Sequence, residues 1–265
     1  MDLKLNSIDK GNSFDFGKTS KDYALYRDIY PKSMYDKLIL FGIGSKGQRI
    51  LDLGTGTGVI PRNMHSTGAI FSGTDISENQ IKEAANLSEG MGINYKVCPS
   101  ENTGFCESSF DVVTACQCFH YFNLNTFVPE LVKILAPKGR FCKLFMDWLP
   151  YEDEIVNEME QFVQKYNPTW TGGGFKQFIY NFPEWAKKYF ELETIHSYNE
   201  YLDFTKDAWC GRIRTCRGVG ASLPYEKIRQ FESEYQELLK KYPSDILHIK
   251  HQIHIEIYRL KDNVK

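Results

Sequence analysis

The chain has 265 residues, of which 42% are hydrophobic and 25% are charged, and its formal net charge is −2. This composition is typical of a globular protein with one large domain, and it offers no broad basic field for nucleic acid. No apolar run approaches the roughly 20 residues of a membrane helix, and the first residues lack the apolar core of a signal peptide. We therefore expect a cytoplasmic protein that binds neither nucleic acid nor membranes.

The seven cysteines are an odd number and do not have the spacing of zinc ligands. Only Cys116 and Cys118 are close in sequence, and they fall in a predicted strand, whose period of two excludes opposite-facing neighbours. We expect reduced, buried thiols and no metal site.

The first 45 residues predict an arm followed by two helices. Residues 1–20 are polar and contain glycine, which predicts a mobile arm. From Thr19, apolar and aromatic residues recur at helical spacing until Pro31 interrupts them. Ser33 is a suitable cap for a second helix.

Residues 49–60 have the pattern of a strand, a glycine turn and a helix. A short apolar strand ends at Leu53, glycines follow at alternate positions, and a helix is predicted from Val59. Glycine permits positive φ and lets the backbone approach a ligand closely. A helix N-terminus offers unpaired N–H groups and the positive end of a dipole. The stretch therefore predicts a nucleotide-type cradle at the carboxyl end of a parallel strand.

The glycine spacing discriminates between nucleotide ligands. The dinucleotide pattern G-x-G-x-x-G would need a third glycine at Val59 or Pro61, and the Gly-Lys-Ser/Thr of a phosphate loop is absent. The segment Asp-Leu-Gly-Thr-Gly-Thr-Gly at residues 52–58 resembles motif I of the class I S-adenosylmethionine-dependent methyltransferases. The alternative is that the glycines of this segment form an ordinary turn. The resemblance implies a cofactor site that contains Asp52, Gly54, Thr55, Gly56 and Gly58.

A second resemblance lies ahead of the glycine turn. Residues 23–31 are similar to the Tyr-x-x-Tyr-Arg-Pro-x-Tyr-Pro element of the trans-aconitate-methyltransferase-like branch, with Asp28 where that branch often has proline. The resemblance implies that this segment covers the cofactor, with Tyr26 and Arg27 near its carboxylate. The alternative is that the tyrosines are core residues and Arg27 is solvated.

The next strand, within residues 69–76, ends in an acid. Asp75 follows Gly58 by 17 residues, close to the roughly 20-residue offset at which an acid meets a ribose. Its carboxylate could accept from both ribose hydroxyls, and Ile76 would lie along the adenine. Asp75 could instead cap the following helix, but Ser77 is better suited to that role.

Two further segments resemble the family at later strand ends. After a third strand at residues 94–98, Glu101 or Asn102 matches the position that contacts the adenine amine, unless this is only a surface loop. Residues 110–123 resemble motif IV, with Tyr121 where tryptophan is usual. The resemblance implies that Cys116 and Gln117 flank the methionine portion. His120 would lie near the transferred methyl group or the substrate, or would be a satisfied structural histidine.

The second half of the chain departs from strand and helix alternation. A helix at residues 127–135 and a strand at residues 139–146 are followed by residues 149–185, which predict a cap insertion. Trp170 in this insertion either lines an apolar pocket beside Phe175 or anchors the cap.

The last hundred residues contain an arginine cluster between predicted elements. Arg212 and Arg214 could clamp a substrate carboxylate in bidentate geometry, or could pair with nearby acids on the surface. Tyr121 is a further candidate substrate contact. A long helix is predicted at residues 224–242, and a half-buried strand at residues 246–260, with its histidines structural.

Together these patterns predict an α/β fold with a doubly wound, mostly parallel, seven-stranded, Rossmann-like sheet. Residues 1–265 would form one methyltransferase domain, with residues 1–45 as arm and lid helices and 149–185 as the cap. The predicted function is transfer of a methyl group from S-adenosylmethionine to a small molecule, which could be a carboxylate or hydroxyl, by a monomer or homodimer. His120 is the candidate base if the nucleophile carries a proton. The alternatives are a non-catalytic S-adenosylmethionine-binding protein and a nicotinamide-dependent oxidoreductase.

Overall fold

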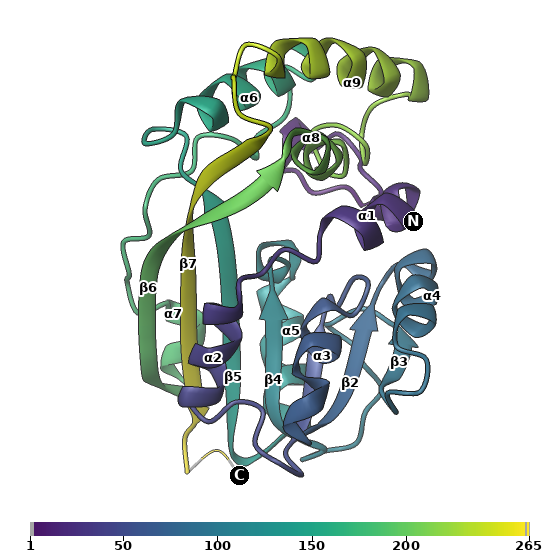
Figure 1. Cartoon of the computed structure of the whole chain (residues 1–265). Coiled ribbons are helices and arrows are strands. Elements are labelled where there is room, and N and C mark those ends of the chain that lie inside the picture. Colours follow the sequence, from purple (N-terminus) through teal and green to yellow (C-terminus); the bar gives the residue numbers. More distant parts are fainter. Residues whose placement is uncertain (1–2, 263, 265) are drawn as a thin grey trace. The chain divides into compact units, whose positions relative to one another are not determined.

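The computed structural model describes residues 3–262 and 264. Over these residues, seven strands form one sheet in the order β3-β2-β1-β4-β5-β7-β6 (Figure 1). The strands are β1 (Arg49–Leu53), β2 (Ile70–Asp75), β3 (Asn94–Val97), β4 (Phe110–Cys116), β5 (Leu135–Trp148), β6 (Phe190–Thr205) and β7 (Ile246–Leu260). The α-helices are α1 (Ser20–Tyr26), α2 (Lys32–Leu40), α3 (Val59–Met64), α4 (Glu78–Leu87), α5 (Leu124–Ile134), α6 (Glu154–Tyr166), α7 (Glu184–Lys187), α8 (Lys206–Arg214) and α9 (Tyr225–Leu239).

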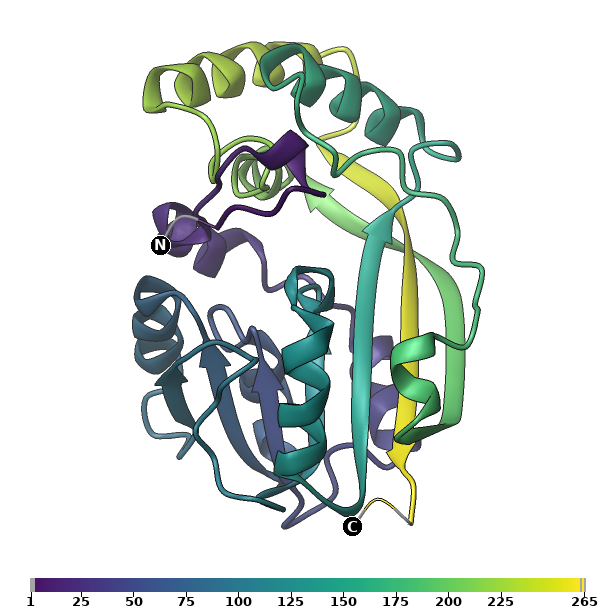
Figure 2. The same ribbon diagram turned by 180° about the vertical axis from the view of Figure 1, so that it is seen from behind.

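The centre of the sheet is parallel, as predicted. β1 pairs in parallel with β2 on one side and β4 on the other, and β3 and β5 extend the parallel set outward. Helices cover both faces, with α3 in front of the sheet in Figure 1 and α5 in front of it in Figure 2. β1 is a central strand covered on both faces, and its residues 50–53 are all buried, the apolar Ile50, Leu51 and Leu53 together with Asp52. The prediction of a doubly wound, mostly parallel sheet is confirmed.

The chain divides into two compact units. The sheet unit consists of residues 30–146, 178–198 and 253–265, and the helical unit consists of residues 1–29, 147–177 and 199–252. Strands β5, β6 and β7 each run from one unit into the other without an intervening loop. Each unit is described separately below.

Each unit has its own core. In the sheet unit, α5 buries Phe127, Leu131 and Ile134 completely against residues of the central strands. In the helical unit, Trp209 and Tyr235 are fully buried, and the indole N–H of Trp209 donates to the Tyr235 hydroxyl at 2.8 Å. Burying an aromatic side chain with its polar atom satisfied contributes apolar burial without a desolvation penalty. Over residues 3–262, no helix is both long and apolar enough to cross a bilayer.

The N-terminal segment differs from the predicted mobile arm. Leu3 pairs with Phe14 in an antiparallel bridge, and Phe14 is completely buried. The Asp9 carboxylate forms a buried ion pair with Arg217, with 2.8 Å between Oδ2 and Nε. The ion pair joins residues more than 200 positions apart, so no local pattern could reveal it. The first helix is also shorter than predicted, and the second begins at Lys32, with Pro31 rather than Ser33 at its cap position.

Two C-terminal strands also differ from the predictions. β5 extends from Leu135 to Trp148, well beyond the predicted residues 139–146. β7 was predicted to be half-buried at the edge of the sheet, but its residues from His251 to Tyr258 are buried on both faces. In the strand order β7 lies between β5 and β6 and runs opposite to both, while β6 takes the edge (Figure 1). His254, predicted on an outer face, is only 1% exposed.

Candidate cofactor site

The glycine turn joins β1 to α3 in a backbone conformation that requires glycine. Gly54, Gly56 and Gly58 have φ of 59°, 56° and 75°, where L side chains are strained. A Cβ on Gly54 would come within 2.8 Å of the Cys118 sulfur, and one on Gly58 would overlap the Tyr95 hydroxyl. Gly54 and Gly58 therefore cannot be replaced without moving these neighbours.

Asp52 lies beneath the turn, near the end of β1. Its side chain is 1% exposed and accepts a hydrogen bond from the Thr114 hydroxyl of β4 at 2.6 Å. Burial raises the pKa of Asp52 to about 6, while hydrogen bonds from Thr114 and Thr55 oppose the rise and the charge of Asp75 adds to it. Because the carboxylate is poorly compensated by protein cations, a positively charged ligand beside it would be stabilised.

Asp75 ends β2 and holds the turn from the other side. Its Oδ2 accepts from the Gly56 N–H at 3.0 Å, and its Oδ1 accepts from the Ser77 N–H at 2.8 Å. Burial raises the pKa of Asp75, and these backbone hydrogen bonds oppose the rise. The predicted cap of α4 is confirmed, since the Ser77 hydroxyl accepts from the N–H of Gln80. Ile76 follows β2 and is half-buried.

The loop after β3 carries the predicted adenine contacts. The Glu101 carboxylate accepts from the Asn123 N–H at 2.8 Å, at the start of α5. Asn102 is exposed, and its N–H donates to the carbonyl of Pro99 at 3.2 Å. The alternative that this segment is only a surface loop therefore fits the exposed Asn102 better than it fits Glu101, which is bonded to α5.

The residues after β4 are held by the neighbouring strand. Cys116 ends β4, and Gln117 has a positive φ of 62°. The Gln117 backbone donates to the Leu144 carbonyl at 3.1 Å, and its side-chain amide donates to that of Met146. The side-chain oxygen of Gln117 is buried and has no hydrogen-bond partner among the described residues. A buried oxygen of this kind at a strand end is suited to accept from a ligand.

His120 and Tyr121 lie in a short 3-10 helix just after this strand end. His120 is exposed, its ring lies 4.0 Å from that of Tyr121, and it lies 6.4 Å from Phe145 of β5. The three strand ends are adjacent, because β1 lies between β2 and β4. The sheet unit thus brings together Asp52, Asp75 and the glycine turn, with Cys116 and Gln117 one strand away.

The other predicted residues belong to the helical unit. Arg27 donates to the Cys216 sulfur at 3.8 Å, in the turn after α1, next to Tyr26. Arg214 forms ion pairs with Asp22 and Glu232. This matches the second reading of the arginine cluster, in which the arginines pair with nearby acids. Among the predicted substrate arginines, Arg214 is therefore the weaker candidate.

Arg212 is buried, at 2% exposure, among aromatic rings. Its guanidinium carbon lies 5.0 Å from the Trp148 ring and 5.4 Å from the Trp209 ring. One of its nitrogens lies 2.6 Å from Nε2 of His251, whose Nδ1 lies 2.8 Å from the Ile249 carbonyl. A carbonyl can only accept a hydrogen bond, so Nδ1 carries the proton and donates to Ile249. Nε2 of the neutral ring is then unprotonated and accepts from Arg212. Burial, and then the charge of Arg212, lowers the pKa of His251, which keeps the imidazole neutral.

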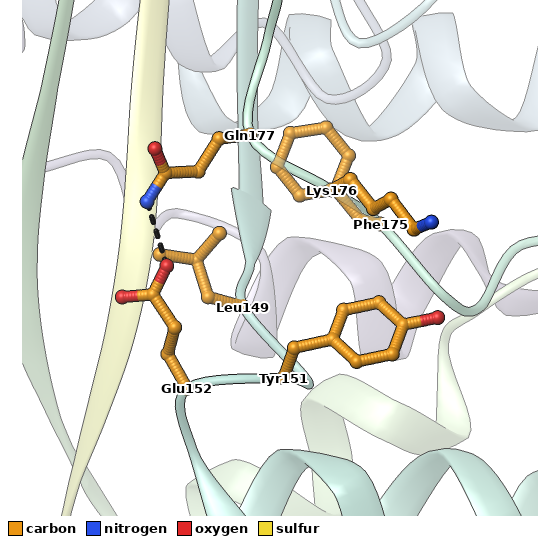
Figure 3. A pocket seen from close by; sticks show the side chains of 6 residues that line it. All are labelled: Leu149, Tyr151, Glu152, Phe175, Lys176 and Gln177. Atoms are coloured by element: carbon orange, nitrogen blue, oxygen red, sulfur yellow. Dashed lines mark hydrogen bonds between the residues drawn. The ribbon is translucent and has the colours of Figure 1, made fainter.

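Trp170 has the contacts of an anchor. It is 6% exposed in the core of the helical unit, and a Cβ on Gly218 would come within 2.9 Å of its ring. Phe175 instead lines a hollow of about 240 Å³ (Figure 3). The hollow has Leu149 and Tyr151 on its apolar wall, and Glu152 on its rim is bonded to Gln177 at 2.6 Å.

The sequence patterns missed one residue at a strand end. Asp147 lies near the end of β5 in the helical unit, and burial raises its pKa to about 7, opposed by the Trp148 N–H and the charge of Arg212. An acid directly after an apolar strand is the signal that identified Asp75. The same signal at Asp147 could have been read from the sequence.

Comparisons with known proteins agree with this geometry. Residues 51–143 match the family model described as "Methyltransferase domain". A ubiquinone/menaquinone biosynthesis C-methyltransferase, UbiE, from Desulfotalea psychrophila is 33% identical over 125 residues, which are 44% of this chain and 48% of that protein. A ubiquinone biosynthesis O-methyltransferase from Paraburkholderia phymatum is 30% identical over 96 residues, covering 35% of this chain and 41% of the relative.

A solved structure matches over a longer stretch. It is described as a type II methyltransferase from Anaeromyxobacter dehalogenans, and it is 21% identical, with a TM-score of 0.58 over 87% of this chain and 96% of that one. This likeness shows the fold. The chain spans about half the length, or less, of the curated relatives named above. The match over residues 51–143, with the sheet order and the glycine turn, identifies this part of the chain as a methyltransferase domain with a Rossmann-like fold.

Proposed function

We propose that this protein binds S-adenosylmethionine at the glycine turn and transfers its methyl group to a small-molecule acceptor. One observation carries the proposal: a turn of three positive-φ glycines, which begins two residues after the buried Asp52, is fastened to a second strand by Asp75. The two buried acids give the turn negative charge, which would suit the amine and the sulfonium of this ligand.

The residues of the sheet unit suit the parts of this cofactor. Asp75 would accept from the ribose hydroxyls with the lone pairs that its backbone bonds leave, and Ile76 would pack along the adenine. Glu101 or Asn102 would meet the adenine amine. The buried side-chain oxygen of Gln117, beside Cys116, would accept from the amino group of the methionine portion.

The remaining predicted contacts come from other segments. Tyr26 and Arg27 would approach the cofactor carboxylate, with residues 1–45 as a lid and residues 149–185 as a cap, in one functional domain. Arg212 would bind an acceptor carboxylate, with Tyr121 near the acceptor. The bound cofactor supplies a methyl group on a sulfonium, which is already a good leaving group.

The protein's own contribution is alignment and the exclusion of water. Alignment of a nucleophile can lower a barrier by on the order of 7–11 kcal/mol at best. If the acceptor is a protonated hydroxyl, the imidazole of His120 would take that proton. If the acceptor is a carboxylate, no base is needed. The two relatives named for C- and O-methylation indicate that this sheet serves different acceptor atoms.

Calorimetric titration with S-adenosylhomocysteine and, separately, with NADH tests the cofactor assignment. We expect the first to bind and the second not to bind, and Asp75→Asn to weaken binding by about tenfold. Labelled cofactor with a panel of carboxylic acids, phenols and amines then tests turnover. Binding without turnover of any class would favour a sensor of the cofactor, while binding of NADH alone would overturn the proposal.

The same preparation tests two further proposals. We propose a cytoplasmic protein that acts as a monomer or homodimer, which light scattering and cell fractionation would examine. Activity that requires a larger assembly, or a membrane fraction, would contradict them.

A further inference from the structure

The loop between β3 and β4 is fixed at one buried residue. Thr103 is completely buried, and both its N–H and its hydroxyl donate to the same oxygen of Glu130, at 3.0 and 2.5 Å. The ammonium of Lys96 donates to the Thr103 carbonyl at 2.7 Å. All three polar groups of Thr103 are therefore held by other elements, Glu130 from α5 and Lys96 from β3.

A second contact ties the same loop to the same helix. The carboxylate of Glu101 accepts from the N–H of Asn123, the cap residue of α5, at 2.8 Å. Asn123 and Glu130 are seven positions apart, which is about two helical turns. Because α5 grips the loop at Glu101 and at Thr103, the position of the helix sets the position of the residues between them.

The Glu130 carboxylate is well placed to hold Thr103 in a fixed position. Its residue is 8% exposed, and its second oxygen accepts from Lys133 at 2.9 Å, so the carboxylate is held from both sides. Hydrogen bonds to a charged acceptor are shorter and stronger than neutral ones. An apolar residue would fill the same space under the loop without fixing Thr103, so the geometry exceeds what packing alone requires.

We propose that Glu130 is a positioning residue for adenine recognition, which holds residues 99–105 so that Glu101 or Asn102 meets the adenine amine. The proposal rests on the proposed function, because it assumes that the cofactor's adenine lies against this loop. Glu130 itself makes no contact with the ligand. Its effect on selectivity comes entirely through Thr103.

The test measures discrimination at the amine. Calorimetry compares S-adenosylhomocysteine with S-inosylhomocysteine, which carries a carbonyl in place of the adenine amine. We expect the wild-type protein to favour the adenine compound and Glu130→Ala to lose about tenfold of that preference, since a loop that moves no longer presents its acceptor. Asn125→Ala, at an exposed position of the same helix, is the matched control and should keep the full preference.

A second pair of variants separates positioning from stability. Thr103→Ser keeps the hydroxyl and should keep the preference, whereas Thr103→Val has nearly the same shape, lacks the hydroxyl, and should lose it. A merely structural role would lower the melting temperature of the variants and leave the ratio of the two dissociation constants unchanged. If Glu130→Ala does not fold, this pair decides the question.

The outcomes distinguish this inference from the function on which it rests. If the wild-type protein binds neither compound, both the proposed function and the inference are wrong. If it binds S-adenosylhomocysteine and the ratio is unchanged in Glu130→Ala and in Thr103→Val, the function stands and Glu130 is not a positioning residue.

Discussion

At the residue scale, Gly58 shows how a neighbour enforces a glycine. Its φ of 75° is already unfavourable for an L residue, and the Tyr95 hydroxyl occupies the place of a Cβ. Gly47 has nearly the same φ, 79°, with no atom within 4 Å of that place. The two positions therefore separate backbone strain from steric overlap.

We expect Gly58→Ala to destabilise the protein more than Gly47→Ala. Strain at positive φ costs on the order of 1–2 kcal/mol in both variants, and the overlap with Tyr95 should add to it only at Gly58. The measurement is the free energy of unfolding in urea, with the cofactor affinity of each variant beside it. Equal losses of unfolding free energy in the two variants would mean that the Tyr95 side chain moves aside without an energetic cost, which would contradict this prediction.

Asp52 predicts a pH dependence of stability. Its pKa is raised from 3.8 to about 6 by burial, so the folded state holds this proton more tightly than the unfolded state does. Ionisation of Asp52 therefore lowers the free energy of unfolding. This loss is absent below about pH 4 and complete above the folded pKa, where it reaches about 3 kcal/mol. Asp52→Asn removes this titration. The free energy of unfolding of the variant should therefore increase relative to that of the wild type as the pH rises from 4 to 8. Parallel curves of unfolding free energy for the two proteins would contradict this.

The residues of the glycine turn were predictable because their pattern is local. Glycine spacing, the acid before it and the acid ending the next strand lie in the printed sequence, and the structure joins them through one bond from Gly56 to Asp75. The fixing of Thr103 by Glu130 was not predictable, since it joins residues 27 positions apart across two elements. The cofactor and substrate roles of the predicted residues remain predictions.

At the element scale, the outcome depends on what defines each boundary. β1, α3, β2 and α4 begin and end near the predicted residues, because apolar runs, glycines and the Ser77 cap mark them locally. The length of β5 and the burial of β7 depend instead on which strands pair with them. Strand order is a property of the assembled sheet, and the alternation along β7 suggested an exposed face that is buried in the structure.

The N-terminal segment gives a prediction for the pair of Asp9 and Arg217. Both side chains are nearly buried, at 3% and 10% exposure, and Asp9 also accepts from the Thr171 N–H at 2.8 Å. Removing one partner leaves an uncompensated buried charge, so Asp9→Asn should cost roughly 3 kcal/mol of unfolding free energy. It should also expose residues 3–17 to limited proteolysis.

Lys10→Gln is the control for this change. Lys10 is next to Asp9 and exposed, and its substitution should alter neither stability nor proteolysis. A protease-resistant N-terminal segment in Asp9→Asn would show that Phe14 and the bridge to Leu3 hold it without the ion pair.

At the scale of the whole molecule, three strands belong to both compact units. Because β5, β6 and β7 pass between the units without a loop, we expect the units to unfold together. Trp185 lies in the sheet unit, and the other three tryptophans lie in the helical unit. The fluorescence of Trp185→Phe therefore reports the helical unit alone. Its urea transition should coincide with that of the far-ultraviolet circular dichroism, and two separated transitions would contradict a shared cooperative unit.

The place of β7 between β5 and β6 has a consequence for biosynthesis. A ribosome makes β6 some forty residues before β7 (residues 190–205 against 246–260), so the nascent β6 has no bonding partner while translation continues. During that interval its unpaired backbone is open to chaperones or to another nascent copy. The acidic residues along β6, at positions 191, 193, 200 and 203, would keep two such copies apart by charge repulsion.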